Sequence, residues 1–264
     1  MTMARRVGKA AAVTLIAATA GGAALLAAEA IAAKTRRYAA PDLRLAIRTT
    51  VGDAAAPPLR LVLMGDSGAL GVGVDRVADT VGGHLAEMLA NDAGPGTPAR
   101  RVELSSVAVL GSRSADLSTQ VARALLGDRP DVAVIVVGAH DALRLRRPSD
   151  AARELGEAVR RLRDAGVAVV VGTCPDLGAV RAFAPPLRQI AGWLGEQLAK
   201  AQTEAVVEAG GTPVDLASRT GPVFRADAGT LCADRYHPSA DGYRVWAHAL
   251  LPAVLDAAGA ANPH

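Results

Sequence analysis

Five short apolar runs, rich in valine, alternate along the chain with longer segments of helical periodicity. Near-continuous apolar runs of this length are typical of strands that are covered on both faces, as in parallel sheets. Strict alternation of strands and helices predicts a doubly wound α/β fold, a three-layer α/β/α sandwich around a five-stranded parallel sheet. The expected strands are residues 59–64, 102–109, 132–137, 167–171 and 213–216, and the expected helices are residues 80–89, 115–126, 151–165, 186–209 and 240–257.

The composition excludes several kinds of function. Aromatic residues make up only 3% of the chain, which disfavours a surface that stacks nucleic-acid bases. Two cysteines are too few for a disulfide-dense scaffold or a four-cysteine zinc module, and we expect no metal. The net charge of +3 is uneven, because residues 1–37 hold six basic residues and one acidic one, which leaves 23 basic and 25 acidic residues for the rest. The slightly acidic remainder disfavours a polyanion partner.

The N-terminal segment has the features of an export signal. Between Ala10 and Ala33 the only charged residue is Glu29, and Arg5, Arg6 and Lys9 precede the stretch. As a helix it would be roughly 36 Å long, enough to cross a hydrocarbon core of roughly 30 Å. An uncleaved signal-anchor fits this length, a signal peptide cleaved near residues 28–30 is the alternative, and an alanine-rich soluble helix is the third. Either export interpretation predicts a protein outside the cytoplasm, anchored in the membrane or secreted.

We therefore expect three parts in the chain. Residues 1–37 are the signal-anchor or signal peptide, and residues 38–58, with three prolines and little periodicity, are expected to be a linker. Residues 59–264 are expected to form the folded domain.

Ligand sites in doubly wound folds form beyond the carboxyl ends of the strands, so the residues that follow each strand are of most interest. Gly65-Asp66-Ser67 follows the first expected strand, and such a turn can project the serine hydroxyl from the sheet edge. Gly111 follows the second strand, and His140 and Asp141 follow the third. Each of these features taken alone is also compatible with an ordinary turn or helix cap.

Asp234 and His237 lie just before the last expected helix. A carboxylate three residues before a histidine can reach the imidazole, select its tautomer and stabilise the imidazolium that forms when the ring takes a proton. The four features occur in one order along the chain, and this combination carries more information than any of them alone.

The combination resembles the SGNH (GDSL-like) hydrolase family, whose fold is flavodoxin-like, over about 200 residues. Gly65-Asp66-Ser67 matches the first family block, Gly111 the second, and Asp234-x-x-His237 the fifth. The third block normally reads Gly-x-Asn-Asp, whereas this chain has His140 in place of the asparagine. Residues 172–178, together with the N-terminal segment, are similar to exported actinobacterial members.

The resemblance implies a serine esterase or lipase-like hydrolase without a cofactor. Ser67 would be the nucleophile, His237 the general base and Asp234 its partner, and Ser67, Gly111 and His140 would form the oxyanion hole. The substrate would be a small-molecule, lipid or glycan acyl ester. An acyltransferase would use the same residues, and a non-catalytic acyl- or glycan-binding module is the alternative that the histidine at position 140 favours.

The two cysteines leave two states open. Cys174 and Cys232 lie in loops that this fold would bring to the same sheet edge, where they could form a disulfide outside the cytoplasm. Two free buried thiols fit the sequence equally well.

Overall fold

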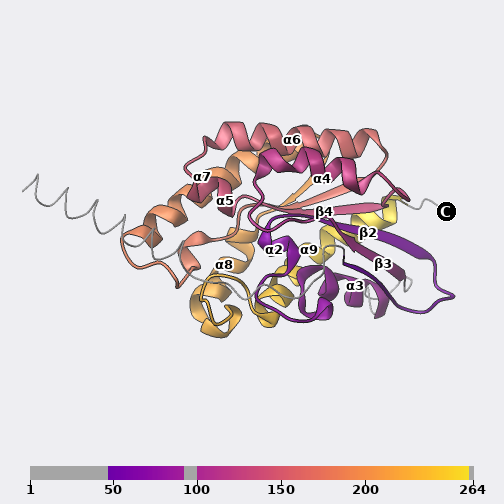
Figure 1. The fold of residues 1–264 in the computed structure, drawn as a ribbon, viewed down its shortest axis with the longest axis horizontal. Helices are drawn as coiled ribbons and strands as arrows, with labels where there is room; N and C mark the ends of the chain where they lie inside the picture. The colour runs from indigo at the N-terminus through magenta and orange to yellow at the C-terminus, as the bar shows by residue number, and fades with distance from the viewer. Residues whose placement is uncertain (1–46, 92–99, 262–264) are drawn as a thin grey trace, which may run out of the picture.

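The computed structural model describes residues 47–91 and 100–261, which form three layers with a twisted sheet in the middle (Figure 1). The sheet contains six strands in the order β1-β3-β2-β4-β5-β6, and the five strands from β2 onward are parallel. The predicted α/β/α sandwich is thus confirmed. The parallel strands are β2 (Pro58–Gly65), β3 (Arg101–Ser106), β4 (Val132–Val136), β5 (Ala168–Gly172) and β6 (Thr212–Val214).

A sixth strand, β1 (Arg48–Val51), lies within the segment that we expected to be a linker. It pairs with β3 in the antiparallel direction, with Arg48 opposite Ser105 and Val51 opposite Val102. Its residues alternate between exposed and half-buried positions. A short edge strand of this kind has no apolar run that would predict it from the sequence. Its hydrogen bonds to β3 are what identify it as a strand.

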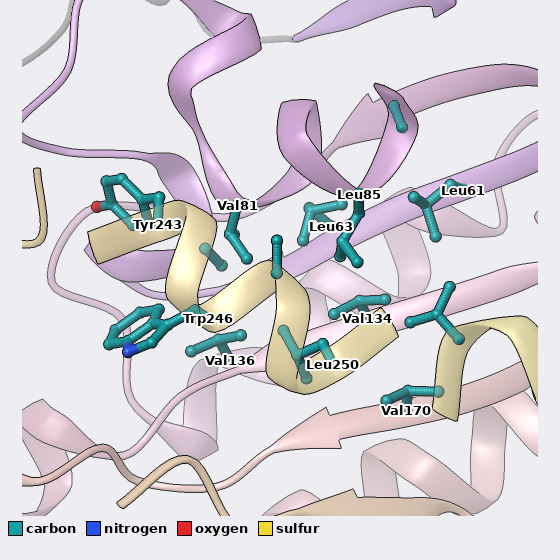
Figure 2. Packing of buried hydrophobic residues seen from close by; sticks show 14 of the residues in the cluster. Leu61, Leu63, Val81, Leu85, Val134, Val136, Val170, Tyr243, Trp246 and Leu250 are labelled. Carbon is teal, nitrogen blue, oxygen red and sulfur yellow. The ribbon is translucent and has the colours of Figure 1, made fainter. Parts of the chain in front are cut away.

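Each face of the sheet has its own apolar core because successive residues of a strand point to opposite faces. In β4, Val132, Val134 and Val136 face one core, while Ala133 and Ile135 face the other. Helices α3 (Val81–Asn91) and α9 (Ala240–Ala261) cover the first face, and α4 (Leu117–Ala124), α6 (Pro148–Asp164) and α7 (Leu187–Glu208) cover the second (Figure 1). Figure 2 shows the first face, where Tyr243, Trp246 and Leu250 of α9 pack beside the strand residues.

The five expected long helices are all present, at slightly different bounds. Helix α8 (Leu216–Ala226) was not predicted, because it contains Pro222, a residue that normally argues against a helix interior. The longer helices are α3 (Val81–Asn91), α4 (Leu117–Ala124), α6 (Pro148–Asp164), α7 (Leu187–Glu208), α8 (Leu216–Ala226) and α9 (Ala240–Ala261).

The strand order determines where a site can form. The first parallel strand, β2, lies between β3 and β4, so the chain crosses to one side of β2 and later to the other. The carboxyl ends of strands at such a switch point diverge and leave a crevice. The Gly65-Asp66-Ser67 turn follows β2 directly at this point.

The hydrophobic segment Ala10–Ala33 lies outside the described residues. Among residues 47–91 and 100–261, no helix combines the length and the apolar character that a membrane crossing requires.

Candidate functional site

The serine turn is built by three consecutive residues with different tasks. Gly65 ends β2 with φ of +128°, and a Cβ at this position would lie 1.8 Å from the carbonyl oxygen of Val136 in β4. Asp66 caps the short helix α2 (Ser67–Leu70), with its Oδ1 accepting a hydrogen bond from the Gly68 amide at 2.9 Å. Ser67 is therefore the first helical residue beyond the sheet edge, and only 5% of its surface is exposed.

The side chains of Asp234 and His237 are hydrogen-bonded to each other within one tight loop. The Nδ1 atom of His237 lies 2.7 Å from Oδ2 of Asp234. The other carboxylate oxygen, Oδ1, accepts hydrogen bonds from the backbone amides of Tyr236 (2.8 Å) and His237 (2.9 Å) and from the thiol of Cys232 (3.0 Å). The three-residue spacing thus lets one carboxylate shape the loop and orient the imidazole.

The electrostatics of this loop favour an ionised Asp234. Burial by itself would raise the pKa of the carboxyl group, but the hydrogen bonds from the His237 ring, the Cys232 thiol and the two amides hold this pKa well below its usual value. A carboxylate that stays ionised can stabilise a positive charge on the adjacent imidazole.

Ser67 and His237 line the same cavity, although 170 positions separate them in the chain. The His237 side chain comes from the loop before α9 and is almost fully buried. The cavity has a volume of about 50 Å³, and its remaining lining is mostly apolar. The structure thus brings together the serine, the histidine and the aspartate that the sequence singled out.

Gly111 and His140 belong to the loops after β3 and β4. Gly111 has φ of +76° in a loop whose preceding residues, Val109 and Leu110, are exposed. His140 is the second residue of helix α5 (Ala139–Leu143). Burial, then the charges of Arg144 and His237, lower the pKa of His140, which favours the neutral imidazole.

Two buried glutamines, which the sequence analysis did not identify, hold the loops of the site together. Gln120 of α4 accepts a hydrogen bond from the Gly65 amide at 2.7 Å and donates to the Gly65 carbonyl at 2.9 Å and to Ser112 Oγ at 3.1 Å. It therefore links the serine turn to the Gly111 loop. Gln202 of α7 similarly accepts from the Cys174 amide and donates to the carbonyl of Val137.

Asp141 fixes the helix that carries His140. Its Oδ2 accepts hydrogen bonds from the amide (2.9 Å) and the hydroxyl (3.0 Å) of Ser114, in the segment that follows Gly111. The hydrogen bonds of Asp141, Gln120 and Gln202 cannot be predicted from the sequence, because a polar residue in an amphipathic helix is normally expected to face solvent.

Asp66 is the most strongly perturbed carboxyl group beside the serine. Its pKa is raised to about 7: burial is the largest cause, the hydrogen bond from the Gly68 amide opposes it, and the charge of Asp141 adds to it. The unfolded chain, with a pKa of 3.8, ionises this group at a lower pH than the folded protein does. Folded Asp66 therefore binds more protons, and the stability of the protein falls as the pH rises from about 4 to about 7.

We expect Asp66→Asn to remove this pH dependence. Asparagine keeps the cap on Gly68 and cannot ionise. The variant should have a larger unfolding free energy than the unchanged protein. This difference between the two proteins should be greater at about pH 8 than at about pH 5, by an amount on the order of 2 kcal/mol. Urea denaturation at both pH values measures it, and an equal difference at the two pH values would contradict the assignment.

Of the two states left open for Cys174 and Cys232, the structure has the free thiols and not the disulfide. Cys174 is buried against α7, with its Sγ 3.5 Å from where a Cβ of Gly195 would lie. Cys232 instead directs its thiol to Asp234. The loops do meet at the same sheet edge, but the two side chains point to different partners.

Within the part of the chain that the structure describes, no group of three or more His, Cys, Asp or Glu residues has an arrangement that could hold a metal ion.

Comparison with known proteins gives the family context of this geometry. Residues 63–245 match the GDSL-like lipase/acylhydrolase family. A GDSL-like esterase of Mycobacterium tuberculosis is 43% identical over 201 residues, which span 75% of this chain and 62% of that relative. The matched region thus covers less than two thirds of the relative's own length.

Solved structures share the fold at lower identity. A lipase/acylhydrolase from Enterococcus faecalis superposes with a TM-score of 0.58 and 20% identity, covering 75% of this chain and 96% of the other. An acetylxylan esterase from Geobacillus stearothermophilus gives a TM-score of 0.57 and 17% identity, covering 77% and 95% of the two chains.

Proposed function

Because the chain belongs to the GDSL-like lipase/acylhydrolase family, we propose that it hydrolyses carboxylic esters through Ser67, His237 and Asp234. The observation that carries this proposal is that Ser67, at the switch point of the sheet, shares a cavity with His237, whose ring is hydrogen-bonded to Asp234. The esterases among the similar proteins support the same reaction class.

In the proposed reaction, the Oγ of Ser67 attacks the acyl carbonyl carbon while Nε2 of His237 takes the hydroxyl proton. Asp234 accepts a hydrogen bond from Nδ1 and stabilises the resulting imidazolium. The bond to the alcohol then breaks, and His237 returns the proton to the departing oxygen. Water attacks the acyl-serine by the same route, which releases the carboxylic acid and restores Ser67.

The negative charge on the substrate oxygen needs donors at a fixed position. We assign this task to the amides of Ser67 and Gly111 and to the ring N–H of His140. Gln120 supports the assignment, because it ties Gly65 of the serine turn to Ser112 in the Gly111 loop.

A serine-directed fluorophosphonate tests the nucleophile. We expect it to modify the protein once, on the tryptic peptide that contains Ser67, because only an activated serine displaces fluoride at a useful rate. Mass spectrometry identifies the peptide, and the Ser67→Ala variant serves as the control. Modification of another serine would overturn the proposal, whereas labelling of Ser67 without ester hydrolysis would favour acyl transfer.

The role of His140 in the oxyanion hole can be tested by substitution. We expect His140→Ala to lower kcat on the order of 10²- to 10³-fold with KM nearly unchanged, since its N–H would act only on the oxyanion. His140→Asn, which restores the amide donor, should recover most of the loss. Equal activity of His140→Ala and the unchanged protein would remove His140 from the oxyanion hole.

For residues 1–37 we propose export of the catalytic domain, with the segment as signal-anchor or cleaved signal. Its support is the stretch Ala10–Ala33, which has Glu29 as its only charged residue and lies between two basic clusters. Fractionation after alkaline extraction, together with the mass of the N-terminal peptide, distinguishes an anchored from a secreted form.

A further inference from the structure

The cavity beside Ser67 is bounded by apolar side chains from several segments of the chain. They come from β4, from the 3₁₀ turn η3 (Leu177–Ala179) and the residue after it, from α8, from the residue that follows the 3₁₀ turn η4 (Ala228–Thr230), and from α9. The apolar lining includes Val136, Leu177, Val180, Phe224, Leu231 and Trp246.

The Trp246 side chain forms the part of the cavity wall that faces Gly68 of the serine turn. A Cβ at Gly68, the residue after Ser67, would lie only 2.9 Å from Cζ3 of the Trp246 ring. The indole is 5% exposed and packs between Phe224, at 6.0 Å between ring centroids, and Tyr243, at 5.8 Å. Figure 2 shows it on α9 beside Val136. Contacts on two sides hold the ring in one orientation.

Two polar side chains of the cavity wall, Thr220 and Asp176, are already engaged within the protein. The hydroxyl of Thr220 donates to the carbonyl of Leu216 at 2.6 Å. Asp176 accepts hydrogen bonds from the Gly178 amide and from Nε of Arg225. A sugar or glycerol placed here would lose hydration without finding equivalent partners, whereas a hydrocarbon chain would only gain by leaving water.

The volume of the cavity limits the length of that chain. An apolar cavity of about 150 Å³ accommodates a benzene ring of six carbons, so about 50 Å³ accommodates roughly two carbons beyond the wall atoms. Together with the carbonyl carbon held at Ser67, this corresponds to acyl groups of about two to four carbons.

We propose that this cavity binds the acyl half of the ester, that it favours short acyl groups, and that Trp246 sets the upper limit of chain length. The inference rests on the proposed function of Ser67. The alcohol half then points to the open side of the site, from which it departs after protonation by His237.

Opposite changes in cavity size give the test. Trp246→Leu enlarges the cavity, and Ala179→Val, in the same lining, reduces it. Trp193→Leu is the matched control, because Trp193 is the only other tryptophan of the chain and is 60% exposed on α7, away from the cavity. We would measure kcat/KM for p-nitrophenyl esters of graded acyl length, together with the deacylation rate, which depends on the acyl group alone because the alcohol has already left.

The unchanged protein and Trp193→Leu should favour short acyl groups and lose activity steeply beyond about four carbons. Trp246→Leu should raise the octanoyl-to-acetyl ratio of kcat/KM by about tenfold or more, since each misplaced methylene changes binding by a factor of this order. Ala179→Val should lower the butyryl-to-acetyl ratio. The shifts should appear in the deacylation rate as well.

Two results would overturn the assignment and leave the proposed function intact. The first is that the dependence of kcat/KM on acyl length is unchanged in both cavity variants. The second is that the variants change kcat/KM with the alcohol in a series of acetates and leave the deacylation rate unaltered. If the unchanged protein cleaves no ester of the series, the proposed function fails first. Because Trp246→Leu removes core packing, its fold is checked by circular dichroism, and Ala179→Val decides the question if that variant unfolds.

Discussion

The Ser67→Ala variant is expected to lose ester hydrolysis by on the order of 10⁴-fold or more in kcat while its melting temperature stays unchanged. The substitution removes a single hydroxyl group from the wall of the cavity and leaves the backbone of the turn intact. Without this oxygen no acyl-enzyme can form, and only the oxyanion donors and substrate binding remain to accelerate attack by water.

A double variant makes this prediction more specific. Ser67 and His237 act as one unit in the proposed reaction, so Ser67→Ala combined with His237→Ala should be about as slow as either single variant. Rates with p-nitrophenyl acetate measure all three. Retention of more than about a tenth of the activity in Ser67→Ala, or multiplicative losses in the double variant, would contradict the assignment.

The Gly65→Ala variant is expected to lose about 4 kcal/mol or more of unfolding free energy, a size that only a few kinds of substitution reach. The new Cβ would lie 1.8 Å from the carbonyl oxygen of Val136 and 2.7 Å from its carbonyl carbon. Both atoms are backbone of the central strand β4, so no side-chain rotation relieves the overlap. Gly65 also has a positive φ that L-residues avoid.

Gly259→Ala is the matched control. A Cβ at Gly259, in the exposed last turns of α9, would meet no atom within 4 Å. Alanine in a helix is more favourable than glycine, so this variant should be unchanged or slightly more stable. Urea denaturation of the three proteins measures the effects. A Gly65→Ala protein as stable as the Gly259→Ala protein would show that β2 and β4 do not approach as closely as the structure has them.

The fold was largely predictable because the central parallel strands β4 and β5 are buried on both faces. Burial of this kind leaves uninterrupted apolar runs, such as Val132–Val137, that the sequence displays directly. Strand β1 and helix α8 were missed for the opposite reason. The edge strand is half exposed and has no apolar run, and the helix tolerates Pro222 in its interior.

Predictability of the site differs between its members. The Asp234–His237 geometry is local, since one carboxylate three residues before the histidine reaches both the ring and the intervening amides. The links made by Gln120 and Gln202 join segments 55 and 65 residues apart, and no local pattern marks them. The thiols of Cys174 and Cys232 illustrate the same limit, because the direction of a side chain within a shared loop region depends on its packing.

The sequence by itself determined the alternation of strands and helices, the order of the chemical groups along the chain and the residues that follow each strand, because hydrophobic periodicity and local spacing are properties of neighbouring residues. Only the tertiary structure decided that Ser67 and His237 share one cavity, that buried glutamines join its loops and that Trp246 forms its wall. These contacts connect distant parts of the chain, and they exist only once the sheet and its helices have packed together.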